Sequence, residues 1–266
     1  QPIGLFDSGI GGLTVLKTLL EEFASEDFLY LGDTARLPYG TKSPATIERY
    51  VLQNIRFLEQ QNVKAIVVAC NSASTVLLGG RLQHLFKVPV YNVIEPGARA
   101  ALQASATKKI GVIGTRATVQ GEAYVSALHA LDTQAQVWQQ ACPLLVPLVE
   151  EGWTDDPVTN LIVYRYLGPL AQTAIDTLIM GCTHYPTLSD SFRRVLGSHV
   201  TLVDSAQAIA QILAADFHAQ KLEANPLHHQ RQIRITATDV SSSFEQIAHQ
   251  MLSPHRFKHL ELVELF

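Results

Sequence analysis

The sequence predicts an α/β protein built from two similar units, each with a mostly parallel sheet covered by helices. Short apolar runs alternate with longer segments of helical periodicity, the pattern of strands joined by crossover helices. Three landmarks also recur in the same order, at offsets of 107, 112 and 109 residues: Gly4 with Gly111, Cys70 with Cys182, and Val93 with Leu202. Near-constant offsets indicate a duplicated unit. A chain of 266 residues is long enough for two such units.

The expected strands are short runs of β-prone residues that end where small or polar residues follow. They cover residues 3–6, 28–31, 65–69, 90–93, 110–113, 136–138, 177–180, 201–203 and 233–236. The longer segments between them space their apolar residues as a helix does. These expected helices cover residues 13–23, 44–60, 74–85, 97–106, 118–131, 155–170 and 205–222. The alternation along the chain is typical of parallel strands joined by helices.

Composition and charge argue against several classes of function. The net charge of −4 and the pI near 6.2 give no electrostatic reason to expect nucleic acid or a membrane surface as a partner. No apolar stretch approaches the roughly 20 residues that span a bilayer, and the first residues carry no signal-like pattern. Three cysteines, an odd number, fit a reducing compartment better than a disulfide framework. We therefore expect a cytoplasmic protein with no nucleic-acid or membrane partner.

Two cysteines follow similar apolar runs and are the main clue to chemistry. Cys70 follows the run 64–69 and Cys182 follows the run 176–181, and polar side chains come directly after each thiol. Ligands bind at the carboxyl ends of strands in open α/β sheets, so two such thiols could face one ligand from opposite sides. That arrangement suggests proton transfer at a carbon centre. Cys142 differs because its neighbours are apolar, and we assign it a structural role.

Groups beside the two thiols could set their protonation. The polar residues after Cys70 resemble a helix start, whose amides would stabilise a thiolate there. His184 lies two residues beyond Cys182 and could exchange a proton with it. Asp7 follows the first strand, where its carboxylate either caps the next turn or reaches the sheet edge that carries the thiols. Glu150 is either an ordinary exposed carboxylate or the partner of one catalytic group.

Other kinds of site have weaker support. Neither Cys70 nor Cys182 has a second cysteine at the close spacing that zinc sites use. A redox pair would need the two thiols within disulfide distance, which spacing along the chain does not show. The glycines after Asp7 lack the G-x-G-x-x-G spacing of a dinucleotide site, although their amides could approach a small anionic ligand.

Seven segments together resemble the glutamate racemase family, within the cofactor-independent aspartate/glutamate racemase superfamily. The resemblance covers nearly the whole chain, and this set of motifs in this order is highly specific. The segments are Phe6-Asp-Ser-Gly-Ile-Gly-Gly12, Tyr30-Leu-Gly-Asp-Thr-Ala35, Pro38-Tyr-Gly40, Val68-Ala-Cys-Asn-Ser-Ala73, Gly111-Val-Ile-Gly-Thr115, Cys142-Pro-Leu-Leu-Val-Pro147 and Gly181-Cys-Thr-His-Tyr-Pro186. One departure is Ser72, where the family usually has threonine; serine keeps the hydroxyl and loses a methyl group.

The resemblance implies that two thiols interconvert L- and D-glutamate on opposite faces of the α-carbon, without a cofactor or a metal. Cys70 would handle the α-proton of D-glutamate with help from Asp7. Cys182 would handle that of L-glutamate with help from His184 and Glu150. The residues implied for holding glutamate are Asp7, Ser8, Tyr39, Gly40, Asn71, Ser72, Thr118, Thr183 and His184. The D-glutamate formed would supply peptidoglycan synthesis.

The resemblance also implies the domain organisation. Two three-layer α/β domains, related by a pseudo-twofold axis, would enclose the active site in the cleft between them. Residues 1–95 with 208–266 would form the domain that carries Cys70, and residues 96–207 the domain that carries Cys182; the family allows a homodimer. Two alternatives stay open: an aspartate racemase or another two-cysteine racemase of the superfamily, and a non-catalytic amino-acid sensor that kept the fold.

Overall fold

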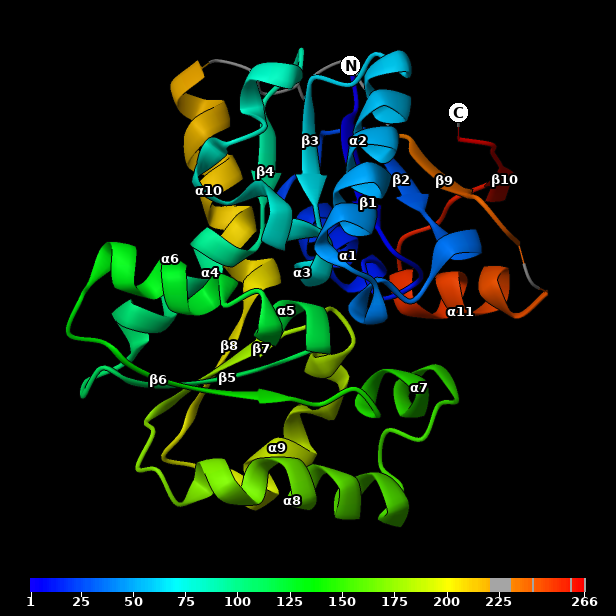
Figure 1. Ribbon diagram of the computed structural model, residues 1–266. Helices are drawn as coiled ribbons and strands as arrows, with labels where there is room; N and C mark the ends of the chain where they lie inside the picture. The colour runs from blue at the N-terminus through cyan, green and yellow to red at the C-terminus, as the bar shows by residue number, and fades with distance from the viewer. Residues whose placement is uncertain (221–230, 241, 259, 266) are drawn as a thin grey trace.

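The computed structural model describes residues 1–220, 231–240, 242–258 and 260–265, in which two parallel sheets form (Figure 1). The first sheet has the order β10-β9-β2-β1-β3-β4 and the second has the order β6-β5-β7-β8. The strands of the first sheet are β1 (Ile3–Asp7), β2 (Phe28–Gly32), β3 (Ala65–Val68), β4 (Val90–Asn92), β9 (Ile233–Ala237) and β10 (Leu260–Leu262). Those of the second are β5 (Lys109–Gly114), β6 (Gln136–Ala141), β7 (Thr177–Gly181) and β8 (Thr201–Asp204).

The two sheets repeat one topology. The order β2-β1-β3-β4 in the first matches β6-β5-β7-β8 in the second, and every paired strand is parallel. Cys70 follows β3 and Cys182 follows β7, the equivalent strand of the other unit. The predicted α/β class and the predicted duplication are therefore confirmed, and the first unit adds β9 and β10 beside β2.

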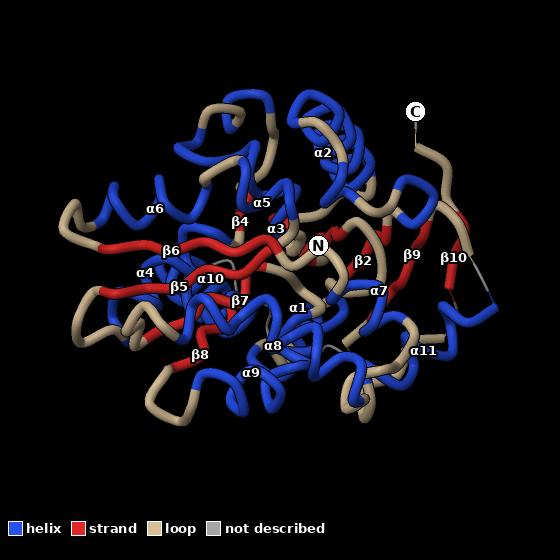
Figure 2. The backbone as a smooth tube through the Cα atoms, turned by 60° about the horizontal axis from the view of Figure 1, so that its bottom comes forward, coloured by secondary structure: helices blue, strands red, loops and turns tan. Residues whose placement is uncertain are grey.

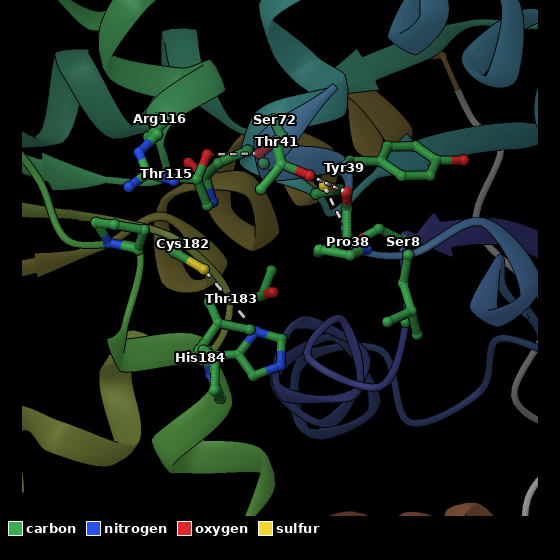
Figure 3. A pocket seen from close by; sticks show the side chains of 18 of the residues that line it. Ser8, Pro38, Tyr39, Thr41, Ser72, Thr115, Arg116, Cys182, Thr183 and His184 are labelled. Carbon is green, nitrogen blue, oxygen red and sulfur yellow. Dashed lines mark hydrogen bonds between the residues drawn. The ribbon is translucent and has the colours of Figure 1, made fainter. Parts of the chain in front are cut away.

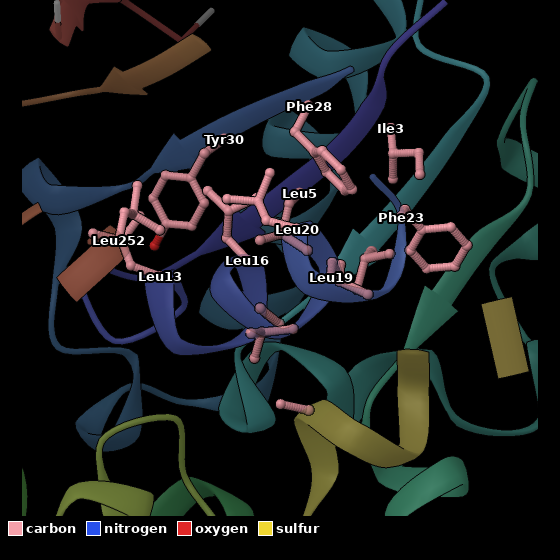
Figure 4. Packing of buried hydrophobic residues seen from close by; sticks show 14 of the residues in the cluster. Ile3, Leu5, Leu13, Leu16, Leu19, Leu20, Phe23, Phe28, Tyr30 and Leu252 are labelled. Atoms are coloured by element: carbon pink, nitrogen blue, oxygen red, sulfur yellow. The ribbon is translucent and has the colours of Figure 1, made fainter. Parts of the chain in front are cut away.

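Helices cover both faces of the first sheet. On one face, α1 (Leu13–Glu22), α10 (Ser205–Gln220) and α11 (Ser242–Leu252) pack in one buried cluster with β1 and β2. Figure 4 shows the centre of this cluster, where Leu16 and Leu20 of α1 lie against the side chains of the sheet. On the other face, α2 (Pro44–Gln60) buries Ile47, Val51 and Ile55. The apolar face of each helix thus meets a sheet, as the predicted periodicity requires.

The second sheet is covered in the same way. On one face lie α8 (Pro157–Ala171) and α9 (Ser189–Leu196), which share a buried cluster with β7. On the other face lie α4 (Ile94–Ala104) and α6 (Ala123–Leu131). The short helix α7 (Leu145–Glu150) follows β6 and lies beside the junction of the two units (Figure 2). The arrangement therefore has three layers in each unit.

Two predicted helices were wrong as continuous elements. In place of a helix over 74–85, the chain forms α3 (Asn71–Ser74) and two 3₁₀ segments, Thr75–Gly80 and Gln83–Leu85. The break has a backbone cause: Leu78 is extended, and Gly79 has a φ of 66°. In place of a helix over 118–131, α5 (Arg116–Gln120) ends at Gly121, and α6 begins after Glu122, whose φ is 48°.

Other differences concern the ends of elements and elements that the pattern did not predict. Helix α4 begins at Ile94, earlier than expected, and strand β6 extends to Ala141. The elements missing from the prediction are α7, α9, α11 and β10, with the 3₁₀ segments Thr34–Arg36, Tyr39–Thr41 and Tyr185–Leu188. The predicted end of the helix over 205–222 lies outside the described residues. No helix in the described part of the chain combines the length and the apolar character that crossing a membrane requires.

Candidate active site

A cavity of about 410 Å³ lies between the carboxyl ends of the two sheets (Figure 3). Both units contribute to it, because Cys70 lies beyond β3 of the first unit and Cys182 beyond β7 of the second. All the predicted site residues line it except Asp7 and Thr118. Those that line it are Ser8, Tyr39, Gly40, Cys70, Asn71, Ser72, Glu150, Cys182, Thr183 and His184. The three cysteines are free thiols, and Cys142 lies in the core of the second unit rather than at the cavity.

Cys70 is held at the beginning of α3. Its sulfur accepts a hydrogen bond from the backbone amide of Ala73 at 3.4 Å, and its thiol donates to Ser8 Oγ at 3.7 Å. Burial raises the pKa of the Cys70 thiol, and the neighbouring Asp7 carboxylate raises it further. The first thiol is therefore held in its protonated form, with helix amides ready to stabilise a thiolate.

Asp7 lies behind Cys70 instead of on the cavity wall. It ends β1 and is 1 % exposed. The amide of Gly9 donates to Asp7 Oδ1 at 3.0 Å, so the carboxylate does cap the following turn. Its Oδ2 has no hydrogen-bond partner in the described residues. Burial raises the pKa of Asp7, against the lowering effect of His184. A carboxyl group beside Cys70 is thus placed to give or take a proton.

Cys182 has an imidazole partner. Its sulfur lies 3.8 Å from Nδ1 of His184, and Nε2 of His184 lies 3.1 Å from Oε1 of Glu150 (Figure 3 shows the first contact). Burial lowers the pKa of His184, but its contacts with Cys182 and Glu150 outweigh burial and raise the pKa to about 10. His184 is therefore an imidazolium near neutral pH. The two thiols have opposite surroundings: a carboxyl group at one and an imidazolium at the other.

Tyr39 lines the cavity with its backbone and not with its phenol. Its ring extends away from the other side chains of the cavity (Figure 3), and its hydroxyl donates to Asp33 while accepting from Asn54. The cavity is therefore lined at this position by the backbone of Tyr39 and Gly40. Gly40 has no room for a side chain, since a Cβ there would lie 2.6 Å from the Cβ of Thr115.

Thr118 does not line the cavity, which differs from its predicted role. It is fully buried and lies behind Thr115, whose Oγ1 is 3.1 Å away. Thr115 and Arg116 line the cavity instead, and Thr115 also contacts Ser72 Oγ at 2.8 Å. The shift follows from the broken helix, because α5 begins at Arg116 and turns Thr118 inward. The sequence does contain a feature that could have predicted Thr115: it follows β5 directly, as Ser8 follows β1 in the first unit.

The remaining wall is apolar and was not predicted as part of the site. Its apolar side chains are Leu37 and Pro38 from the first unit and Pro143, Leu144, Val146 and Pro147 from the second, and Gly9 and Thr41 complete the lining. Such a wall excludes water from a small ligand and strengthens electrostatic interactions inside the cavity. The described residues contain no group of three or more His, Cys, Asp or Glu side chains arranged for a metal ion. What the cavity offers is two thiols, each with its own acid–base partner, around space for a small molecule.

Comparison with known proteins gives a consistent result. The model of the Asp/Glu/hydantoin racemase family matches residues 4–213. A glutamate racemase from Sulfurihydrogenibium sp. is 44 % identical over 100 % of this chain and 99 % of its own length. A glutamate racemase isoform from Bacillus anthracis has a crystal structure that matches with a TM-score of 0.94 at 40 % identity, covering 100 % of this chain and 98 % of that one. The Francisella tularensis glutamate racemase, solved in complex with D-glutamate, has a TM-score of 0.91 at 35 % identity, covering 99 % and 97 %.

Proposed function

The chain belongs to the Asp/Glu/hydantoin racemase family, and on that premise we propose that it is a glutamate racemase that moves the α-proton between Cys70 and Cys182 without a cofactor. One observation carries the mechanism: both thiols line a single cavity, and each has its own proton-handling partner. A protein that only bound an amino acid would have no need of this pairing.

The different surroundings of the thiols define one starting state. Turnover of L-glutamate requires Cys70 to start as a thiol and Cys182 as a thiolate. With L-glutamate, the Cys182 thiolate takes the α-proton while the Cys70 thiol delivers its proton to the opposite face of the α-carbon. The products are D-glutamate, a Cys182 thiol and a Cys70 thiolate, so protons and charge balance. To restore the starting state, His184 gives its Nε2 proton to Glu150 or solvent and takes the proton of the Cys182 thiol, while Asp7 passes one proton from solvent to the Cys70 thiolate, so that protons and charge again balance.

The site must also stabilise the negative charge that develops as the α-proton leaves. Hydrogen-bond donors around the substrate carboxylate supply this stabilisation, and loss of one such donor typically costs about 3 kcal/mol in the barrier. The candidates at the cavity are Ser8, Asn71 and Thr183, with the backbone of Tyr39 and Gly40. Arg116 stands exposed at the rim, where its positive charge would attract a dicarboxylate.

The domain boundaries and the biological role are part of the proposal. Residues 1–95 with 208–266 would form one domain and residues 96–207 the other. In support, Ile209 and Phe217 of α10 pack in the core of the first sheet, whereas Ala98 and Ala101 of α4 pack against the second. The D-glutamate formed would enter peptidoglycan precursors in the cytoplasm.

Cysteine substitution tests the two-thiol mechanism. We expect Cys70→Ala and Cys182→Ala each to lower racemisation of glutamate by at least about 10²-fold to 10⁴-fold, the usual contribution of a general acid or base. Circular dichroism measures racemisation, and NMR in deuterium oxide measures exchange at the α-carbon. Cys142→Ala is the matched control, because it removes a buried thiol from the core instead of from the cavity.

The same assays separate the alternatives. Racemisation that survives in both Cys70→Ala and Cys182→Ala would rule out the two-thiol mechanism. Faster turnover of aspartate than of glutamate by the unmodified protein would show a different substrate. A protein that binds glutamate without any deuterium entering the α-carbon would be the non-catalytic sensor.

A further inference from the structure

Tyr124, at the start of α6 in the second unit, makes a buried hydrogen bond to the first unit. Its hydroxyl donates to Oδ1 of Asn71 at 2.6 Å, and Asn71 follows Cys70 directly. Tyr124 is fully buried and does not line the cavity, whereas Asn71 does. A phenol from one domain thus holds a cavity residue of the other.

The hydrogen bond also sets the orientation of the Asn71 amide. The Tyr124 hydroxyl donates its one proton to Asn71 Oδ1, so the amide oxygen is occupied. With its oxygen occupied, Asn71 has its Nδ2 group left to donate, and this atom has no hydrogen-bond partner in the described residues. A buried donor without a partner is costly unless a ligand satisfies it. A carboxylate oxygen of glutamate is an acceptor of the right kind.

The ring of Tyr124 contacts the other thiol-bearing loop. Gly181, the residue before Cys182, lies so close that a Cβ there would be 3.0 Å from Tyr124 Cε2 and 2.7 Å from the carbonyl oxygen of Ile113. A side chain at this position would therefore displace the ring or the strand. Tyr124 reaches the loop of Cys182 with its ring and the loop of Cys70 with its hydroxyl.

We propose that Tyr124 is a positioning residue for racemisation: it orients the Asn71 amide toward substrate and holds the two thiol-bearing loops in register. The inference rests on the proposed function and adds to it a residue outside the cavity. Since the tyrosine acts through a group that binds substrate, its loss changes KM more than kcat. It also acts equally on both enantiomers, because Asn71 would hold a part of glutamate that is common to both.

The test is Tyr124→Phe, which keeps the ring on Gly181 and removes only the hydroxyl. We expect KM for both L- and D-glutamate to rise about 10-fold to 100-fold, the usual cost of leaving a buried polar partner unsatisfied. Tyr91→Phe is the matched control, because Tyr91 is a partly buried tyrosine that does not line the cavity. Its KM should equal that of the unmodified protein.

A double-mutant cycle separates positioning from a purely structural role. In the Asn71→Ala background, Tyr124→Phe should raise KM little further, because the group it orients is absent. A structural role would instead lower the melting temperature and give the same additional loss in both backgrounds. If Tyr124→Phe does not fold, Gly97→Ala is the second variant: its Cβ would lie 3.3 Å from the Tyr124 hydroxyl, so it presses on the phenol and should raise KM in the same way.

The outcomes distinguish this inference from the proposed function. If the unmodified protein racemises neither isomer of glutamate, the proposed function fails, whatever the tyrosine does. If it racemises glutamate and Tyr124→Phe has an unchanged KM, only the role of Tyr124 is overturned. A rise in KM for both isomers that disappears in the Asn71→Ala background supports the inference.

Discussion

At the scale of single residues, the two thiols are equivalent in topology and different in environment. Cys70 and Cys182 follow the same strand of the two units, yet one has a buried carboxyl group as its neighbour and the other an imidazolium tied to Glu150. The duplication therefore accounts for two sulfurs at one cavity but not for their partners. A two-base reaction needs this difference, because one sulfur must hold a proton while the other lacks one.

This difference predicts that each partner residue assists proton transfer at one of the two thiols. Enantiomers have equal free energy, so kcat/KM must fall by the same factor in both directions in any variant. The asymmetry should appear in the isotope effects instead. With Asp7→Asn we expect the larger deuterium isotope effect with α-deuterated D-glutamate, and with His184→Asn the larger effect with L-glutamate. Initial rates followed by circular dichroism measure both.

The control for this prediction is Glu150→Gln. Glu150 reaches Cys182 only through His184, so its variant should shift the isotope effects in the direction of His184→Asn and by less. Identical isotope effects for both enantiomers in Asp7→Asn and His184→Asn would show that the carboxyl group and the imidazole do not serve separate thiols.

The buried carboxyl group of Asp7 should also reduce stability at neutral pH. Burial raises its pKa in the folded state, so the folded protein favours the protonated form. The protonated Asp7 side chain stabilises the folded state fully at a pH below its unfolded pKa, near 3.8. This stabilisation is lost as the pH rises through the higher pKa that Asp7 has in the folded state. We therefore expect Asp7→Asn to melt a few degrees higher than the unmodified protein at pH 8.

The measurement is the melting temperature of both proteins between pH 4.5 and pH 8. The advantage of Asp7→Asn should shrink as the pH falls, because the wild-type carboxyl group then becomes neutral. A variant that is less stable than the wild type at every pH would mean that the Asp7 carboxylate stabilises the fold. In that case the buried Asp7 carboxylate would not reduce stability in favour of catalysis.

At the scale of elements, strands were predictable and short helices were not. The apolar runs leading to Cys70 and Cys182 specified β3 and β7, because a strand buried on both faces has a continuous apolar signature. The predicted helix over 118–131 failed at Glu122, an exposed glutamate in a left-handed conformation that few residues of its type adopt. Thr118 therefore lies on the short helix α5 instead of at the start of a long helix.

The same limit explains which site residues were missed. Thr115 caps a helix of five residues that begins at Arg116, and the start of this helix depends on how Thr115 caps the chain after β5. The apolar side chains of Leu144, which caps α7, and of Val146, within it, line the cavity, and α7 is too short to show periodicity. The two thiols and their acid–base partners were recognisable from motifs along the sequence. The residues that form the cavity walls were not, because their placement depends on tertiary packing.

At the scale of the whole molecule, the cavity depends on how closely the two units meet. Thr14 Oγ1 of α1 donates to the carbonyl oxygen of Thr183 at 3.1 Å, across the junction. Gly40 of the first unit contacts Thr115 of the second with no space for a Cβ. These contacts hold the carboxyl ends of the two sheets against each other, so the distance between the thiols is set by small residues at the junction.

Gly11 is the junction residue whose replacement should have the largest effect on catalysis. A Cβ there would lie 2.4 Å from Oγ1 of Thr183 and 2.5 Å from Nδ1 of His184, so alanine must displace the imidazole or push the units apart. A displacement of about 1 Å in a catalytic group costs about 10²-fold in rate, and we expect Gly11→Ala to lower kcat/KM by that order. Gly168→Ala is the matched control, since a Cβ within α8 would have nothing within 4 Å, and its activity should be unchanged. Wild-type kcat/KM in Gly11→Ala would show that the two units can separate without loss of catalysis, and that the close contact at Gly11 does not set the geometry of the thiols.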